Sequence, residues 1–383
     1  MIAVPIYATP TQPTAPPVPT APPLPILYYD GRGRAVLRLV LGNAILGLLT
    51  GGLYRFWAKT RFRRHIWNHI VFDGDRLEYM GRPDELMIGL IVVAIVFIPI
   101  AAALGLATDL LAFNAPKGAM FYHFGTIALL YLLGQLALYR ARFYRMSRTA
   151  WRGIRFRQSG SAFGYMRRWL GWSALTTISL GLLLPFRNQS LYRYRMGHTW
   201  LGDRQIHYDR HKGSGWGLMP RWFLCWLLLA PSLGASYAWY RAAELRYFIA
   251  RTKFGALEPS LDISSWKVLK VYAWPAIIML ITIGLGGVLI KFILTSLYDT
   301  DMWSLGTEDA NGIPIWLSSL LYAVMVFFVY GIVQQIITHR LIRAIGLRLR
   351  VEGPLDAYGL RQSAERSRRS GEGLADVLDA GGL

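Results

Sequence analysis

The chain has 383 residues, of which 54% are hydrophobic and only 17% are charged, yet its formal net charge is +20. These values are compatible only if apolar and basic residues occupy separate stretches, which excludes an ordinary soluble multidomain enzyme and indicates an integral membrane protein. A single cysteine, Cys225, excludes an intramolecular disulfide and a cysteine-rich zinc site.

The chain begins with a proline-rich stretch that holds nine prolines up to Pro25. Because it has neither a basic start nor an apolar core, we expect no signal peptide. We predict a disordered tail over residues 1–30, a membrane domain over 31–350 and a polar, disordered tail over 351–383.

Seven stretches have the length and apolar character of a membrane helix, for which about 17–25 residues are needed. They predict an all-α polytopic membrane protein with about seven hydrophobic helices. The stretches run over 36–53, 86–107, 120–138, 169–186, 219–240, 271–294 and 314–337.

Charge is distributed unequally between the connections. Residues 139–168 contain nine basic residues and no acid, whereas residues 295–313 contain four acids and no Lys or Arg. The positive-inside rule then predicts a multi-pass protein of the bacterial inner (plasma) membrane, with basic loops and the C-terminus in the cytoplasm. Residues 108–119 and 295–313 would face outward, so 86–107 pairs with 120–138, and 271–294 with 314–337, as two hairpins.

The three remaining stretches, 36–53, 169–186 and 219–240, leave two alternatives open. Their length favours full crossings and hence seven spans. The basic connection 187–218 favours four spans and three re-entrant or interfacial segments. The same choice decides on which side the N-terminus lies.

A weak internal repeat runs through the chain. Small-residue breaks occur within four apolar stretches, at 49–53, 178–181, 231–234 and 282–286. Basic-aromatic runs follow, and then polar-to-glycine elements such as Thr149–Gly153. Short alternating stretches predict cytoplasmic β-hairpins at 71–79, with an Asp-Gly turn, and at 154–165, with a Ser-Gly turn, and a strand within 202–209.

The run GNAILGLLTGGLYRFWAKTRFRRHIWNHIVFDGDRLEYMGRPDELMIG (42–89) resembles the YjgN-like bacterial inner-membrane proteins. YRARFYRMSRTAWRGIRF (139–156) and TWLGDRQIHY (199–208) are similar to later blocks of that family. The resemblance covers about residues 30–350 and implies a membrane location and fold type. Because the family has no established activity, it implies no catalytic residues.

The basic-aromatic runs abut apolar helices, where Arg and Lys reach lipid phosphates and Trp and Tyr lie among headgroups. We therefore predict the lipid bilayer, through anionic headgroups, as the partner, and not nucleic acid. The predicted headgroup contacts are Arg55, Trp57, Arg61, Arg63, Arg64, Arg140, Arg142, Arg145, Arg193 and Arg195.

Nothing in the sequence indicates a metal, cofactor or catalytic site. His65 and His69 are spaced to share a helix face, but two ligands are too few for zinc. They would need His198, His207 or His211 brought close by folding. Asp73 is typical of a turn and Asp84 of a helix N-cap, so neither predicts catalysis.

Three functions remain open. The first is transport of a small solute or envelope lipid, for which the ionisable or polar candidates in the membrane are Arg38, His123, Gln135 and Lys291. The second is a non-catalytic scaffold that binds anionic lipid or a protein partner through its basic loops. The third is a lipid-modifying enzyme.

Overall fold

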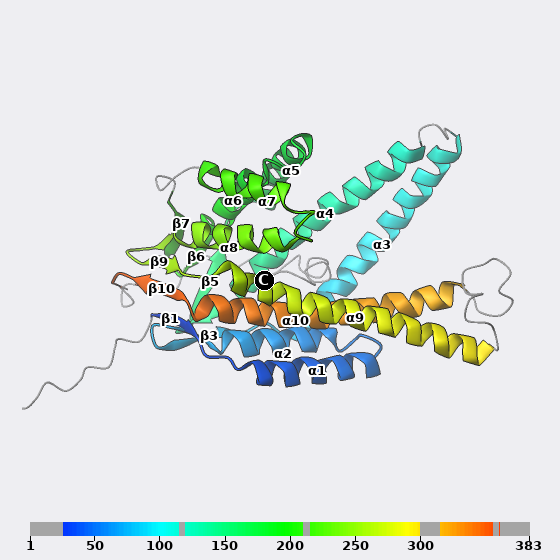
Figure 1. The fold of residues 1–383 in the computed structure, drawn as a ribbon, viewed down its shortest axis with the longest axis horizontal. Coiled ribbons are helices and arrows are strands. Elements are labelled where there is room, and N and C mark those ends of the chain that lie inside the picture. Colours follow the sequence, from blue (N-terminus) through cyan, green and yellow to red (C-terminus); the bar gives the residue numbers. More distant parts are fainter. Residues whose placement is uncertain (1–25, 115–118, 210–214, 299–314, 355–359, 361–383) are drawn as a thin grey trace, which may run out of the picture.

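The computed structural model describes residues 26–114, 119–209, 215–298, 315–354 and 360. Most of the proline-rich N-terminal tail and nearly all of the C-terminal tail lie outside these residues. Within them one order of elements recurs, in which a pair of helices is followed by one or two short strands (Figure 1).

Two of the helix pairs are long. Helix α3 (Pro83–Asn114) packs on α4 (Ala119–Ser147), and α9 (Ser265–Tyr298) packs on α10 (Ile315–Gly346). Both predicted helical hairpins are therefore present. Their connecting turns, 115–118 and 299–314, lie outside the described residues, and the membrane face they occupy stays a prediction.

The other helix pairs are short. They are α1 (Gly33–Leu49) with α2 (Arg55–Trp67), α5 (Ala162–Ile178) with α6 (Leu184–Met196), and α7 (Met219–Leu227) with α8 (Ala235–Ile249). A 3-10 helix, η2 (Gly215–Leu218), precedes α7. The apolar stretches 36–53, 169–186 and 219–240 are thus not single helices, and the prediction of seven hydrophobic helices is corrected.

Glycine explains where these three stretches turn. Gly52, Gly181 and Gly234 adopt φ values of +90°, +89° and +83°, a left-handed conformation that ends a helix. The fourth small-residue break, 282–286, lies inside the continuous helix α9. There Gly286 has a different use, because a Cβ atom at this position would lie 2.2 Å from Met325 Sδ of α10.

The hairpin strands join into an eight-stranded antiparallel sheet in sequence order, and two further strands pair separately. The described chain is mostly helical, as expected, but the all-α class is corrected, because the short hairpins join into a continuous sheet. The eight strands are β1 (Leu27–Tyr29), β2 (Ile70–Phe72), β3 (Asp75–Tyr79), β4 (Thr149–Trp151), β5 (Ile154–Gln158), β6 (Thr199–Leu201), β7 (Arg204–Tyr208) and β8 (Thr252–Phe254). The separate pair is β9 (Glu258–Leu261) and β10 (Leu349–Glu352).

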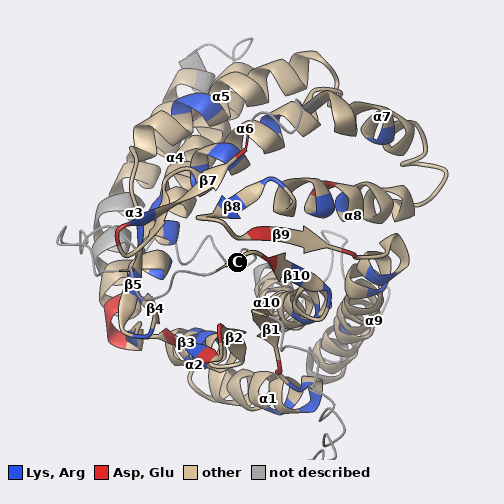
Figure 2. Ribbon diagram, turned by 90° about the vertical axis from the view of Figure 1, so that its left-hand side faces the viewer, with Lys and Arg blue, Asp and Glu red and all other residues tan. Residues whose placement is uncertain are grey.

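The ten strands follow one another around a circle. β8 adjoins β9 through a bridge between Phe254 and Leu257, and β10 contacts β1. Figure 2 shows this arrangement with most of the helix pairs outside the strands. All five helix pairs therefore start and end at one layer, which we call the strand layer.

Two hairpin turns test the sequence prediction. Asp73 and Gly74 both have positive φ, so the predicted Asp-Gly turn is confirmed. The predicted Ser-Gly turn in 154–165 is wrong. That hairpin turns earlier, at Arg152 and Gly153, and the chain after Gln158 enters α5, whose N-cap Ser161 accepts a hydrogen bond from the Gly164 amide at 3.3 Å.

A helix pair and the strands that follow it form one unit. The second helix of a unit is hydrogen-bonded to the first strand of the next unit. The Arg142 guanidinium of α4 donates to Thr199 Oγ1 of β6 at 3.3 Å, and the Tyr192 hydroxyl of α6 lies 2.9 Å from Thr252 Oγ1 of β8. The apolar residues of the strands face a shared interior, where Trp151 and Leu201 pack with Leu360.

Candidate functional site

A cavity of about 260 Å³ lies between α1, α2 and α10. Its wall is apolar near the turn of the α1–α2 hairpin, where Gly47 and Gly52 of that hairpin face Phe328 of α10. Because glycine has no side chain, α10 approaches the hairpin closely there.

One wall of the cavity is cationic. Arg55, Lys59 and Arg63 are spaced four residues apart on α2, and this spacing places them on one face of the helix. The Arg55 guanidinium lies 4.7 Å above the Phe327 ring of α10, and Arg63 donates to the Tyr79 hydroxyl at 3.1 Å. The three cations therefore run from the tip of the hairpin to the strand layer.

The other walls supply amide groups. Asn43 of α1 donates to the Ala58 carbonyl of α2 at 3.3 Å, which fixes the two helices across the cavity. Gln334 donates to the Tyr330 hydroxyl at 2.9 Å. The side-chain carbonyl oxygen of Gln335 is buried without a hydrogen-bond partner in the described part of the chain, so it can accept one from a ligand.

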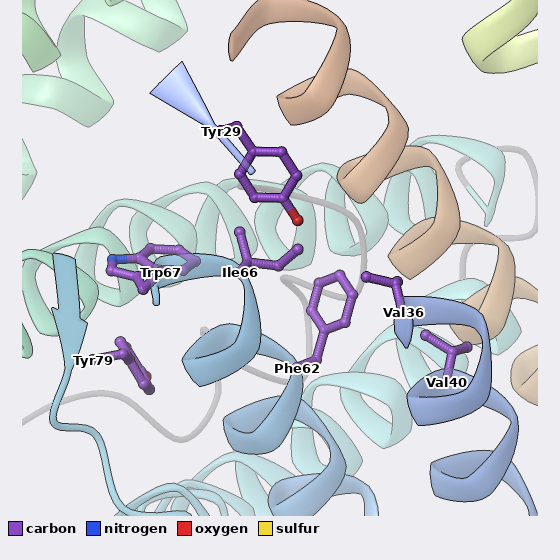
Figure 3. Packing of buried hydrophobic residues seen from close by; sticks show 7 residues of the cluster. All are labelled: Tyr29, Val36, Val40, Phe62, Ile66, Trp67 and Tyr79. Carbon is purple, nitrogen blue, oxygen red and sulfur yellow. The ribbon is translucent and has the colours of Figure 1, made fainter. Parts of the chain in front are cut away.

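A packed cluster closes the cavity toward the strand layer. Val40 and Phe62 both line the cavity and belong to this cluster, which Figure 3 shows together with Tyr29, Val36, Ile66, Trp67 and Tyr79. The Tyr29 hydroxyl lies 2.9 Å from His339 Nδ1 of α10, so it ties β1 to that helix. Burial and the nearby Asp30 carboxylate raise the pKa of Tyr29 to about 12, which keeps the hydroxyl neutral.

This lining can bind an anion that carries an apolar chain. Three guanidinium or ammonium groups provide charge-assisted donors, and the remaining lining is apolar apart from amide and hydroxyl residues. The described lining residues include no acid, histidine, cysteine or serine.

The ten predicted headgroup contacts do not share one surface. Trp57, Arg61, Arg64 and Arg140 are exposed, whereas Arg63 and Arg145 are buried. The remaining four are half-buried, namely Arg55, Arg142, Arg193 and Arg195. Of these four, only Arg55 lines the cavity. Headgroup contact stays a prediction for all ten.

The histidines take structural positions. The rings of His65 and His69 are 4.3 Å apart, and burial together with the His69 charge lowers the pKa of His65. His198 instead packs on the Tyr194 ring, 4.2 Å away. Across the described ranges, no three His, Cys, Asp or Glu side chains are placed to hold a metal, and His211 lies outside them.

Most of the residues that line the cavity were not predicted from the sequence. The prediction included Arg55 and Arg63 but omitted Lys59, although the four-residue spacing of the three is visible in the sequence. It also passed over Gln334 and Gln335, a polar pair inside a charge-free apolar stretch. The transport candidates Arg38, His123, Gln135 and Lys291 do not line the cavity.

The fold defines a mostly helical protein with helices suited to a membrane. Three are long and apolar enough to cross one, namely Met120–Ser147, Ser265–Leu294 and Leu317–Gly346, and Ile98–Leu111 is a shorter apolar helix. The model of a family described as bacterial protein of unknown function (DUF898), which includes the YjgN-like proteins, matches residues 25–219 and 210–356. The chain belongs to this family, which confirms the resemblance seen in the sequence. Searches of curated proteins and of solved structures found no match.

Proposed function

We propose that this protein is a multi-pass protein of the bacterial inner membrane that binds an anionic membrane lipid in the cavity between α1, α2 and α10. The observation that carries the proposal is the row of Arg55, Lys59 and Arg63 inside a cavity that is otherwise lined by apolar, amide and hydroxyl residues. A phospholipid offers the complementary chemistry, because it joins a phosphate to acyl chains.

The helix lengths support the membrane placement. At about 1.5 Å per residue, the 29 residues of α4 span about 44 Å, and the 34 residues of α9 span about 51 Å. The hydrocarbon core is about 30 Å thick, so both long hairpins can cross it and still reach the strand layer.

Charge supports the orientation. The strand layer carries the basic connections, and at this layer Arg64 donates to the Gly81 carbonyl and Arg148 pairs with Glu85. By the positive-inside rule this layer lies in the cytoplasm. Because β1 belongs to the same layer, Leu27–Tyr29 lie on the cytoplasmic side too.

Lipid retention tests the binding proposal. The protein is extracted from membranes that contain phosphatidylglycerol, and the bound lipid is measured by native mass spectrometry. Each cation near a headgroup contributes about 1 kcal/mol. The double variant Arg55→Gln/Lys59→Gln should therefore lose about 2 kcal/mol, which corresponds to about 30-fold in affinity for phosphatidylglycerol.

Two controls complete the test. Arg61→Gln removes an exposed cation of the same helix that bonds to Tyr54 and does not line the cavity, so it should leave lipid retention unchanged. Arg55→Lys keeps the charge and should retain most of the lipid. Equal retention by Arg55→Gln/Lys59→Gln and the parent protein, or equal binding of phosphatidylglycerol and phosphatidylcholine, contradicts the proposal.

A further inference from the structure

The three short hairpins end in the same turn. In each turn a hydroxyl residue is followed by two residues with positive φ; this hydroxyl residue is the C-cap of the first helix in two of the hairpins and comes five residues after the end of α7 in the third. The hydroxyl residues are Thr50, Ser179 and Ser232, and the positive-φ pairs are 51–52, 180–181 and 233–234. Three turns of one geometry indicate a common environment.

The backbone amides of these turns are hydrogen-bonded within the turns themselves. In the first, the amides of Thr50, Gly51, Gly52, Leu53 and Arg55 all donate to backbone carbonyls within the turn or the last turn of α1, and the Tyr54 amide donates to Thr50 Oγ1 at 3.0 Å.

The same pattern recurs in the other two turns. The amides of 179–184 and 232–237 are all bonded, and Ser179 Oγ and Ser232 Oγ accept from the residue four positions later at 3.2 and 3.1 Å. A turn surrounded by water does not need this, because water can bond to its amides. A turn in hydrocarbon does, since each unsatisfied group there costs several kcal/mol.

The side chains at the tips are apolar and face outward. Leu53, Leu180 and Leu233 are 66%, 76% and 97% exposed. The flanking sequence has no charged residue over 39–54, 169–186 and 222–240. The exposed leucine on each tip gives it an apolar surface that water does not favour.

The hairpins are too short to cross. α2 and α6 have 13 residues each and extend about 20 Å from the strand layer, whereas α4 extends about 44 Å from the same layer. Figure 1 shows the long hairpins reaching beyond the short ones. If the long hairpins just cross the core of about 30 Å, the short tips end about 24 Å before the far face, inside the hydrocarbon.

We infer that the three short hairpins enter the membrane leaflet next to the strand layer and turn back within its hydrocarbon, with the acyl chains of that leaflet covering their leucine tips. This inference differs from the lipid-binding proposal, because the cavity lies between helices and binds a headgroup, whereas the tips contact acyl chains. It rests on the membrane placement of the long hairpins. The consequence is an asymmetric protein that occupies more of one leaflet than of the other.

The test places single cysteines at the tips in a Cys225→Ala background, reconstituted in vesicles of phosphatidylethanolamine and phosphatidylglycerol at 3:1. The variants are Leu53→Cys, Leu180→Cys and Leu233→Cys. His207→Cys on β7 reports the strand-layer side, and Phe113→Cys near the end of α3 reports the other side, since both parent residues are exposed. Accessibility is measured with a membrane-impermeant maleimide and, on spin-labelled protein, with oxygen and a nickel chelate.

The inference expects the tip cysteines to resist the maleimide from both faces and their spin labels to be relaxed strongly by oxygen and weakly by nickel. Labelling of a tip from the face on which Phe113→Cys is labelled shows a full crossing and overturns it. Labelling from the face on which His207→Cys is labelled, or weak relaxation by both reagents, which shows a protein cover, also overturns it. If Phe113→Cys and His207→Cys are labelled from the same face, the membrane placement of the long hairpins fails instead.

Discussion

Trp222 of α7 donates its indole N–H to the carbonyl oxygen of Gly181 at 3.0 Å, although the two residues belong to different helical hairpins. Trp226, one turn later on α7, donates to the Leu180 carbonyl at 3.1 Å in the same way. The turn between α5 and α6 is therefore bonded to its neighbour, and the Gly181 carbonyl also accepts from the Leu184 amide at 3.2 Å.

Replacing Trp222 with Phe should lower the thermal stability of the protein. The change removes the indole donor and leaves the Gly181 carbonyl with the Leu184 amide alone, so it should cost the net contribution of one hydrogen bond, about 0.5–1.5 kcal/mol. Unfolding in detergent, followed by circular dichroism, measures the effect. Trp274→Phe on the exposed face of α9 should change little, and an equally stable Trp222→Phe protein would argue against the contact.

Gly181→Ala and Gly234→Ala should each destabilise the protein by about 1–2 kcal/mol, because alanine is strained at φ values of +89° and +83°. Gly284→Ala is the matched control. It lies in the continuous helix α9 with no atom within 4 Å of the added Cβ, so it should be neutral or stabilising. The same unfolding measurement compares all three. Equal effects at the three glycines would contradict the turn assignment.

These turns show what the sequence could and could not predict. The small-residue breaks at 178–181 and 231–234 marked the turns correctly, since a hydroxyl residue followed two positions later by glycine is a local signal. The similar-looking break at 282–286 is helical, and there Gly286 serves packing against Met325 of α10. Only the packing partner in the folded protein distinguishes a glycine that ends a helix from a glycine that lets two helices pack closely.

The sheet and the cavity depended on contacts distant in sequence. The hairpin at 71–79 was predictable from its Asp-Gly turn, but the pairing of Leu77 with Trp151 joins residues far apart in the chain. Likewise, the cationic face of α2 is visible in the sequence, whereas its position opposite Gln335 follows from the packing of α10 on α1.

Glu244 of α8 should be essential for stability. Its carboxylate is fully buried and accepts hydrogen bonds from Asn188 of α6 at 2.8 Å and from Tyr240, and it pairs with Arg241. Glu244→Ala leaves the Arg241 charge without its partner, so we expect a loss of about 3–5 kcal/mol. Yield of monodisperse protein and its unfolding temperature measure the loss. Glu78→Ala on exposed β3 is the control and should behave like the parent protein.

His65 should make stability depend on pH. Burial and the His69 charge lower its pKa, so the folded state binds a proton less readily than the unfolded state, whose histidine has a pKa near 6.5. The contribution of neutral His65 to the free energy of unfolding is fully present above about pH 6.5. It is lost as the pH falls from there through the lowered folded-state pKa. His65→Gln should flatten the fall in unfolding temperature between about pH 7 and pH 5. His207→Gln, which changes an exposed histidine of β7, should keep the parent slope. If both variants keep it, His65 does not control the acid response.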